Sequence, residues 1–171
     1  FNTLVIAERC NFVLPRDITY RFPEYPTNDG STPIKYLEKI CREAAVRRYR
    51  VITVSVEDRL REELHLIEKY NLAGFLLIYR DIIQMAHEIQ IELGLVDSEL
   101  PVEESPPGRG RGSSVAMLIG YLIGLSHIDP LQYALSLERF LPDQDLLHVP
   151  DIDLDFPRNI REELIKRVHK K

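Results

Sequence analysis

The most constraining stretch of this chain is residues 149–156, whose sequence VPDIDLDF alternates acidic and apolar side chains. Asp151, Asp153 and Asp155 occupy every second position. In an extended strand, successive side chains point to opposite faces, so the three aspartates would share one face and the apolar side chains the other. The pattern therefore predicts a strand at the edge of a core, with one buried face and one acidic face.

The acidic face has two interpretations. Neighbouring carboxylates repel one another, and a bound hard cation relieves this repulsion, with oxygen ligands favouring magnesium, calcium or manganese over zinc. Alternatively, the strand lies at a solvent-facing edge, where its charges prevent edge-to-edge aggregation. The residues of the strand alone leave both interpretations open.

A second motif, the sequence GRGRGSS at residues 108–114, precedes an apolar run at residues 115–123. A glycine-rich turn that leads into a helix is suited to bind an anion, because free N–H groups and the positive end of the helix dipole lie together. Arg109 and Arg111 add guanidinium groups that can bind phosphate oxygens through paired hydrogen bonds. The glycine spacing matches neither a Walker loop nor a dinucleotide-binding fingerprint. The alternative is a flexible Arg/Gly connector of the kind found in RNA-binding tails.

Apolar residues at helical spacing predict helices in the regions 1–12, 33–48, 55–71, 82–89 and 115–123. Ser55 and Asp58 are the expected capping box of the third of these helices. Ser113 or Ser114 is the expected cap of the last one, which should end near Gly124.

One short apolar run, residues 75–79 with the sequence FLLIY, is predicted to form a buried strand because the run is continuous. Asp81 is then the expected cap of the helix that follows this strand. Residues 94–107 are acidic and contain proline, which predicts a mobile surface loop.

The composition excludes several classes of protein. A net charge of −5 does not match a dedicated nucleic-acid binder, although residues 158–171 hold six Lys or Arg against two Glu. Cys10 and Cys41 are the only cysteines, which argues against a disulfide framework or structural zinc and predicts a cytoplasmic location. The longest apolar run is about half of a membrane span, so no membrane partner is expected. The chain lacks an initial Met and ends within an amphipathic pattern, so we expect a piece of a longer chain.

A phosphate-binding loop and an acidic strand in one small domain indicate metal-assisted phosphoryl chemistry, with carboxylates acting as metal ligands rather than as nucleophiles. The acidic strand alone also fits a metal-dependent nuclease or phosphoesterase. The Arg/Gly loop alone also fits a non-catalytic phosphate- or RNA-binding module.

Four motifs follow one another in the chain: GRGS at 110–113, GLSHIDPL at 124–131, ERFL at 138–141 and PDIDLDF at 150–156. In this order they resemble the palm of the C-family bacterial replicative DNA polymerases, which include the alpha subunit of DNA polymerase III and its error-prone relatives. Residues 2–11 are similar to the end of that family's N-terminal phosphoesterase-like (PHP) domain. The resemblance covers nearly the whole chain.

The resemblance implies an α/β (α+β) fold, a polymerase-beta-like nucleotidyltransferase palm that is mostly helical with a small mixed sheet carrying the acidic strand. Residues 1–30 would be the end of the PHP domain and the linker to the palm. Residues 31–171 would be the N-terminal part of the palm domain.

The resemblance also implies roles for individual residues. The catalytic, metal-binding pair would be Asp153 and Asp155, with Asp151 in a supporting role. The triphosphate of the incoming nucleotide would be held by the loop residues Gly110, Arg111, Gly112 and Ser113. The implied cofactor is a pair of Mg²⁺ ions, the substrates are primer–template DNA and deoxynucleoside triphosphates, and the partners are a sliding clamp and other replisome subunits.

The chain departs from the family pattern in two respects. The loop at residues 93–107 is longer than in the commonest members. The family's third catalytic aspartate, its thumb and its fingers lie downstream of the residues present here. DNA polymerase activity is therefore expected of the parent chain, whereas the isolated 171-residue chain is expected to be inactive.

Overall fold

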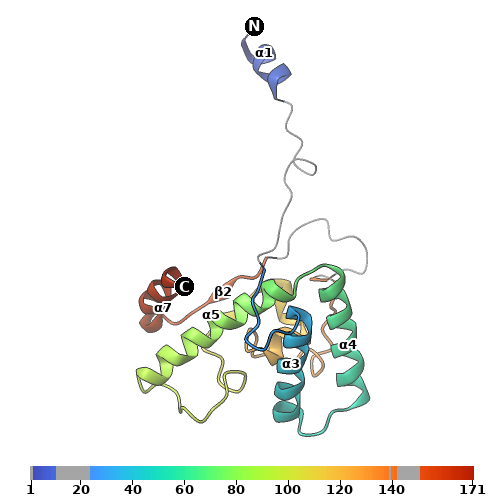
Figure 1. The fold of residues 1–171 in the computed structure, drawn as a ribbon, viewed down its shortest axis with the longest axis vertical. Coiled ribbons are helices and arrows are strands. Elements are labelled where there is room, and N and C mark those ends of the chain that lie inside the picture. The colour runs from blue at the N-terminus through green and yellow to red at the C-terminus, as the bar shows by residue number, and fades with distance from the viewer. Residues whose placement is uncertain (1, 11–23, 139, 142–150) are drawn as a thin grey trace.

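The computed structural model describes residues 2–10, 24–138, 140–141 and 151–171, and most of these are helical (Figure 1). Its first helix, α1 (Asn2–Arg9), has no buried residue. Much of the expected linker and Pro150 of the last motif lie outside the described residues. Among the described helices, none has both the length and the apolar character needed to cross a membrane.

Three long helices and a short one form the core. α3 (Pro33–Tyr49) contacts both α4 (Val54–Lys69) and α5 (Ala73–Glu92). The five-residue helix α6 (Leu118–Leu122) contacts α3 and α4. All four helices contribute fully buried side chains, among them Leu37, Leu60, Leu76 and Leu118.

The helix predicted to begin near Ser55 is α4, but its cap is Thr53. The Thr53 hydroxyl accepts a hydrogen bond from the N–H of Val56 at 3.4 Å, and Thr53 has the extended backbone that a cap adopts. Asp58 instead accepts a hydrogen bond from Arg61 at 3.3 Å. The predicted capping box is therefore wrong, although the helix is confirmed.

The predicted buried strand at residues 75–79 is also wrong, because these residues form the first turns of α5. α5 contacts both α3 and α7 (Arg158–Lys170), so apolar side chains cover more than one of its faces and the run loses helical spacing. Asp81 lies inside α5 rather than at its start. Its carboxylate accepts a hydrogen bond from the hydroxyl of Tyr25 at 3.0 Å.

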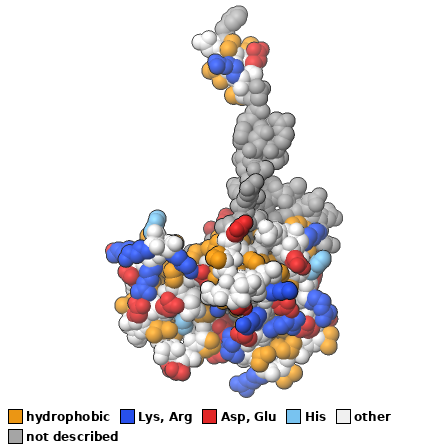
Figure 2. All heavy atoms as spheres, viewed as in Figure 1, with side chains coloured by type: hydrophobic (Ala, Val, Ile, Leu, Met, Phe, Trp, Pro, Cys, Tyr) orange, Lys and Arg blue, Asp and Glu red, His pale blue; other side chains and the backbone are white. Residues whose placement is uncertain are grey.

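The C-terminal helix α7 packs along α5 (Figure 1). Ile160 and Leu164 of α7 are buried against Ala86 and Ile89 of α5. The opposite side of α7 is charged, and Figure 2 shows Lys and Arg side chains gathered over this helix. α7 is thus amphipathic, as the end of the sequence predicts.

The predicted surface loop at residues 94–107 is attached to the core near its end. Val102 and Glu103 are buried. The carboxylate of Glu103 also forms an ion pair of 2.5 Å with Arg47 of α3. Most residues between 94 and 100 are exposed, so the two halves of the loop have different surroundings.

The apolar run that follows the glycine–arginine loop is not a single helix. It begins as a 3₁₀ turn, η1 (Gly112–Ala116), passes through Met117 in an extended conformation and continues as α6. Neither predicted serine caps α6, because both lie within η1. The hydroxyl of Ser114 instead donates to the carbonyl oxygen of Arg111 at 2.7 Å.

The sheet consists of two short strands that are distant in sequence. β1 (Arg109–Gly110) pairs with β2 (Leu154–Asp155), with Arg109 opposite Asp155 and Gly110 opposite Leu154. The expected small sheet with the acidic strand is present, but over the described residues it is antiparallel rather than mixed. The glycine–arginine loop and the acidic strand therefore lie side by side.

Candidate active site

Residues 151–156 have the predicted alternation of exposed and buried side chains, although within them only Leu154–Asp155 form the strand β2. The three aspartates are exposed, whereas Ile152 is buried and Leu154 and Phe156 are half-buried. Tyr79 of α5 supports the buried side, because its hydroxyl donates to the carbonyl oxygen of Ile152 at 3.1 Å. The carboxylates of this strand are thus presented to solvent by an apolar face that is anchored in the core.

The pKa of the Tyr79 hydroxyl depends on its burial and on the nearby aspartates. Burial raises the pKa of the Tyr79 hydroxyl, and the carboxylates of Asp151 and Asp153 raise it further. The hydroxyl therefore stays protonated at neutral pH and remains a donor to the strand backbone.

Arg111 connects the glycine–arginine loop to two of the aspartates. Its backbone N–H donates to the carbonyl oxygen of Asp153 at 3.0 Å, and its guanidinium forms an ion pair with the carboxylate of Asp155. The side chains of this pair are 66% and 49% exposed, so solvent and solutes can reach both. The structure thus brings together the predicted triphosphate loop and the predicted catalytic pair.

Two glycines allow this close approach. A Cβ atom on Gly108 would lie 2.6 Å from the carbonyl oxygen of Asp155, and one on Gly110 would lie 2.8 Å from that of Leu125. The N–H of Gly110 donates to this same oxygen of Leu125 at 2.7 Å. Neither position can accept a larger residue unless the backbone moves.

Replacing Gly108 with alanine is expected to loosen the pairing of β1 with β2. The added methyl group overlaps the backbone of β2 at a cost of about 1–3 kcal/mol, so the Arg111 amide should exchange its hydrogen about tenfold faster or more. Gly94→Ala is the control, because a Cβ there meets nothing within 4 Å and its strain at a φ of +66° is remote from the strands. Unchanged exchange of the Arg111 amide in the Gly108 variant would contradict the close contact.

The turn η1 offers backbone donors next to the Arg111 guanidinium. N–H groups at the start of a helical turn have no acceptor within that turn. Gly112 has a φ of +68° and lies in open surroundings, and Ser113 is half-buried. The predicted loop residues therefore form a surface segment with donors suited to an anion.

No role was predicted from the sequence for Glu63 of α4, which contacts the start of α6. Glu63 is fully buried, and its carboxylate accepts hydrogen bonds from the N–H groups of Leu118 and Ile119 at 2.7 and 2.8 Å. The start of α6 is thus occupied by a carboxylate of the protein, so the anion-binding prediction applies to η1 and not to α6. A signal was available, because Glu63 falls within the apolar stripe that includes Leu60 and Ile67.

The motif at residues 124–131 packs against the loop. The Nε2 atom of His127 lies 2.7 Å from the carbonyl oxygen of Gly108. The carboxylate of Asp129 accepts a hydrogen bond from the N–H of Leu131 at 2.9 Å and so orders its own turn. These contacts give the motif a supporting role for the site.

Two exposed carboxylates next to the glycine–arginine loop are the residues here that could hold a metal ion. Across the described ranges, no three or more His, Cys, Asp or Glu side chains are grouped closely enough to hold an ion. Asp155 of β2 and Asp153, which directly precedes β2, supply two exposed carboxylates. Such a pair fits magnesium, which is usually bound by one or two carboxylates together with waters and substrate phosphates.

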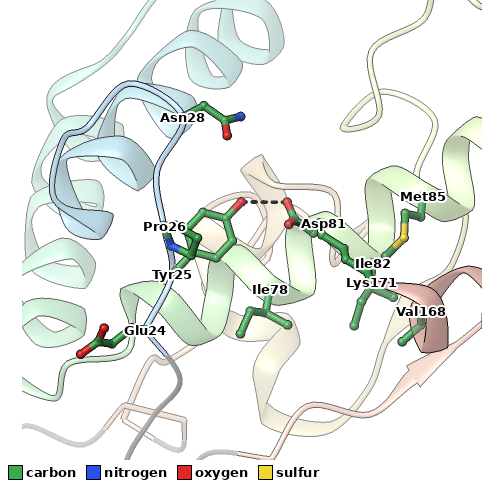
Figure 3. Close-up of a pocket in the computed structure, with 10 residues that line it drawn as sticks. All are labelled: Glu24, Tyr25, Pro26, Asn28, Ile78, Asp81, Ile82, Met85, Val168 and Lys171. Atoms are coloured by element: carbon green, nitrogen blue, oxygen red, sulfur yellow. Dashed lines mark hydrogen bonds and ion pairs between the residues drawn. The ribbon is translucent and has the colours of Figure 1, made fainter.

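A cavity of about 570 Å³ lies elsewhere, between residues 24–28, α5 and α7 (Figure 3). Within it, the Asp81 carboxylate accepts the hydrogen bond from Tyr25 and pairs with the ammonium group of Lys171. Burial and the neighbouring Asp81 raise the pKa of Tyr25 to about 12. None of the predicted site residues lines this cavity, so the candidate site is the exposed junction of loop and strand.

Comparison with known proteins gives one consistent result. The family described as "Bacterial DNA polymerase III alpha NTPase domain" matches residues 35–171. DNA polymerase III subunit alpha of Halalkalibacterium halodurans is 36% identical over 171 residues, which cover 99% of this chain and 14% of that protein. The error-prone DNA polymerase of Symbiobacterium thermophilum is 33% identical over 170 residues, with coverage of 99% and 14%. The alpha subunit of Bacillus subtilis is 34% identical over 166 residues, with coverage of 97% and 14%. The chain therefore spans about one seventh of the length of these relatives.

Proposed function

Because the chain belongs to the bacterial DNA polymerase III alpha family, we propose that it is part of the palm of a DNA-directed DNA polymerase. In this proposal the parent enzyme adds deoxynucleotides to the 3′ end of a primer. The observation that carries the proposal is the contact of Arg111 with Asp153 and Asp155, which joins a phosphate-binding loop to an acidic strand.

The proposed domain division follows the same reasoning. Residues 1–30 are the end of a PHP domain and a linker, and residues 31–171 are the N-terminal part of a polymerase-beta-like palm. The family match begins at residue 35, and α1 has no buried residue, which supports a boundary between the two parts.

In the proposed site, Asp153 and Asp155 hold magnesium, and Asp151 supports them with its charge. Two magnesium ions, when bound, supply positive charge that offsets the charge on the phosphate oxygens during phosphoryl transfer. The carboxylates act as ligands, and the attacking oxygen comes from the primer. The charged face of α7 is suited to the DNA backbone, because five residues of α7 and the next residue, Lys171, are Lys or Arg, whereas only two residues of α7 are Glu.

Arg111 has two alternative anionic partners in this proposal. In the structure its guanidinium pairs with Asp155. When a nucleotide binds, Arg111 exchanges this carboxylate for phosphate oxygens and leaves Asp155 free to serve as a ligand. The N–H groups of Gly112 and Ser113 then add donors from the backbone.

Arg111→Ala is expected to raise the KM for deoxynucleoside triphosphate about tenfold to a hundredfold, because a charge-assisted bond to phosphate is lost. The KM of Arg111→Lys should lie between that of Arg111→Ala and that of the wild type, because lysine keeps the charge but lacks the paired donors. Arg109→Ala is the matched control, because Arg109 is exposed on the same loop but is not assigned to the triphosphate. Equal effects at the two arginines would contradict the specific role of Arg111.

Primer extension by the full-length polymerase that contains this chain tests the proposed function. Magnesium-dependent, templated extension that stops when magnesium is chelated would support it. Degradation of the DNA without extension would favour a metal-dependent nuclease or phosphoesterase. Binding of RNA or DNA without metal and without any reaction would favour a phosphate-binding module. The isolated 171-residue chain is expected to be inactive, and templated incorporation by it would overturn that part of the proposal.

A further inference from the structure

Two short helical segments follow one another directly after the glycine–arginine loop. η1 ends at Ala116 and α6 begins at Leu118, with Met117 extended and fully buried between them. The first N–H groups of each segment have no acceptor inside that segment. The contacts of these two starts with other parts of the protein determine which start remains accessible to a triphosphate.

Glu63 occupies the second of the two starts. Its Oε1 atom accepts a hydrogen bond from the N–H of Leu118 and its Oε2 atom accepts one from the N–H of Ile119, and its side chain has no exposed surface. A buried carboxylate that accepts two backbone N–H groups is held in one orientation. α6 is therefore fixed to α4 at the residue where it begins.

Arg59, one turn before Glu63 on α4, binds both this carboxylate and the end of η1. Its Nε atom donates to Glu63 at 2.7 Å, and its Nη2 atom donates to the carbonyl oxygen of Ala116 at 2.8 Å. Burial raises the pKa of Glu63, while the two N–H groups and Arg59 act in the opposite direction. The pair thus fixes the chain on both sides of Met117.

We propose that Arg59 and Glu63 are positioning residues that hold η1 in the orientation needed to bind the triphosphate of the incoming nucleotide. This inference rests on the proposed nucleotide-binding function of the loop. Arg59 holds the end of η1 through the carbonyl oxygen of Ala116. The hydrogen bond from the Ser114 hydroxyl to the carbonyl oxygen of Arg111 holds the start of η1. With the start of α6 filled by Glu63, η1 is the segment of the two that remains for the nucleotide.

The test is steady-state kinetics of the full-length polymerase that carries this chain, with Glu63→Gln and Arg59→Lys. Glutamine keeps the shape of Glu63 but places an NH₂ donor against N–H or guanidinium donors. Lysine keeps the charge of Arg59 but lacks the rigid planar group whose Nε and Nη2 atoms reach Glu63 and Ala116 separately. We expect the KM for deoxynucleoside triphosphate to rise about tenfold in either variant, with affinity for primer–template DNA unchanged.

A purely structural role would give a different result. Partial unfolding lowers the concentration of active enzyme and therefore kcat, but it leaves KM unchanged, so an unchanged KM in both variants would overturn the proposal. Glu62→Gln is the matched control, because Glu62 is the adjacent residue on α4 and is exposed. Its KM and kcat should stay within about twofold of wild type. A wild-type enzyme that shows no templated incorporation would overturn the proposed function itself, which is a separate outcome.

Discussion

Asp153→Asn and Asp155→Asn are each expected to lower magnesium-dependent primer extension by about a thousandfold or more. Asparagine keeps the size of the side chain and one oxygen but removes the negative charge that holds a hard cation. Both residues are exposed, as Asp151 is, so the substitutions should not disturb the core. The measurement is the rate of extension by the full-length polymerase at saturating nucleotide and magnesium.

Asp151→Asn is the control for these two variants. It removes the same charge from the same segment, but the residue is assigned only a supporting role. Its rate should fall by about tenfold to a hundredfold, a loss typical of groups that support metal ligands and smaller than that of the two other variants. Extension that persists in the Asp153 or the Asp155 variant would show that the catalytic pair is assigned wrongly.

Glu63→Ala is expected to lower the free energy of unfolding by about 3–5 kcal/mol. The substitution leaves the Arg59 side chain, which is 15% exposed, without its counter-charge. It also leaves the N–H groups of Leu118 and Ile119 buried without an acceptor, which adds a desolvation penalty. Urea denaturation of the 171-residue chain, followed by far-UV circular dichroism, measures the change.

Glu62→Ala separates this effect from a general effect of removing a glutamate from α4. Glu62 is exposed, so its loss should change the free energy of unfolding by no more than about 0.5 kcal/mol. A loss below about 1 kcal/mol for Glu63→Ala would mean that solvent reaches the buried groups and replaces the carboxylate.

The sequence predicted those parts of the site that depend on local pattern. The alternation of residues 151–156 follows from the two-residue period of a strand, and the structure confirms it. The presence of the glycine–arginine loop and this strand in one small domain indicated phosphoryl chemistry, and the structure places the two side by side. The register of Arg109 with Asp155 was not predictable, because pairing over such a distance in sequence has no local signal.

The errors arose where tertiary contacts override local pattern. Residues 75–79 were predicted to be a strand because a short continuous apolar run fits a buried strand and a buried helix equally well. They form a helix, and α5 is buried by two neighbouring helices. The run after the loop read as one helix because Glu63, about fifty residues earlier, supplies the cap that starts α6 separately. Buried polar contacts between distant segments give only a weak signal in the sequence, which here is a glutamate within an apolar stripe.

The attachment of the 94–107 loop at Val102 and Glu103 has a consequence for variation in chain length. The anchored residues lie between the exposed part of the loop and Gly108, so a change in length before residue 101 does not alter the path of the chain into β1. Closing a longer flexible loop costs little, about 0.6 kcal/mol for each doubling of its length. Evolutionary insertions, epitope tags and fluorescent labels can therefore be accommodated at residues 95–99 while the strands keep their register.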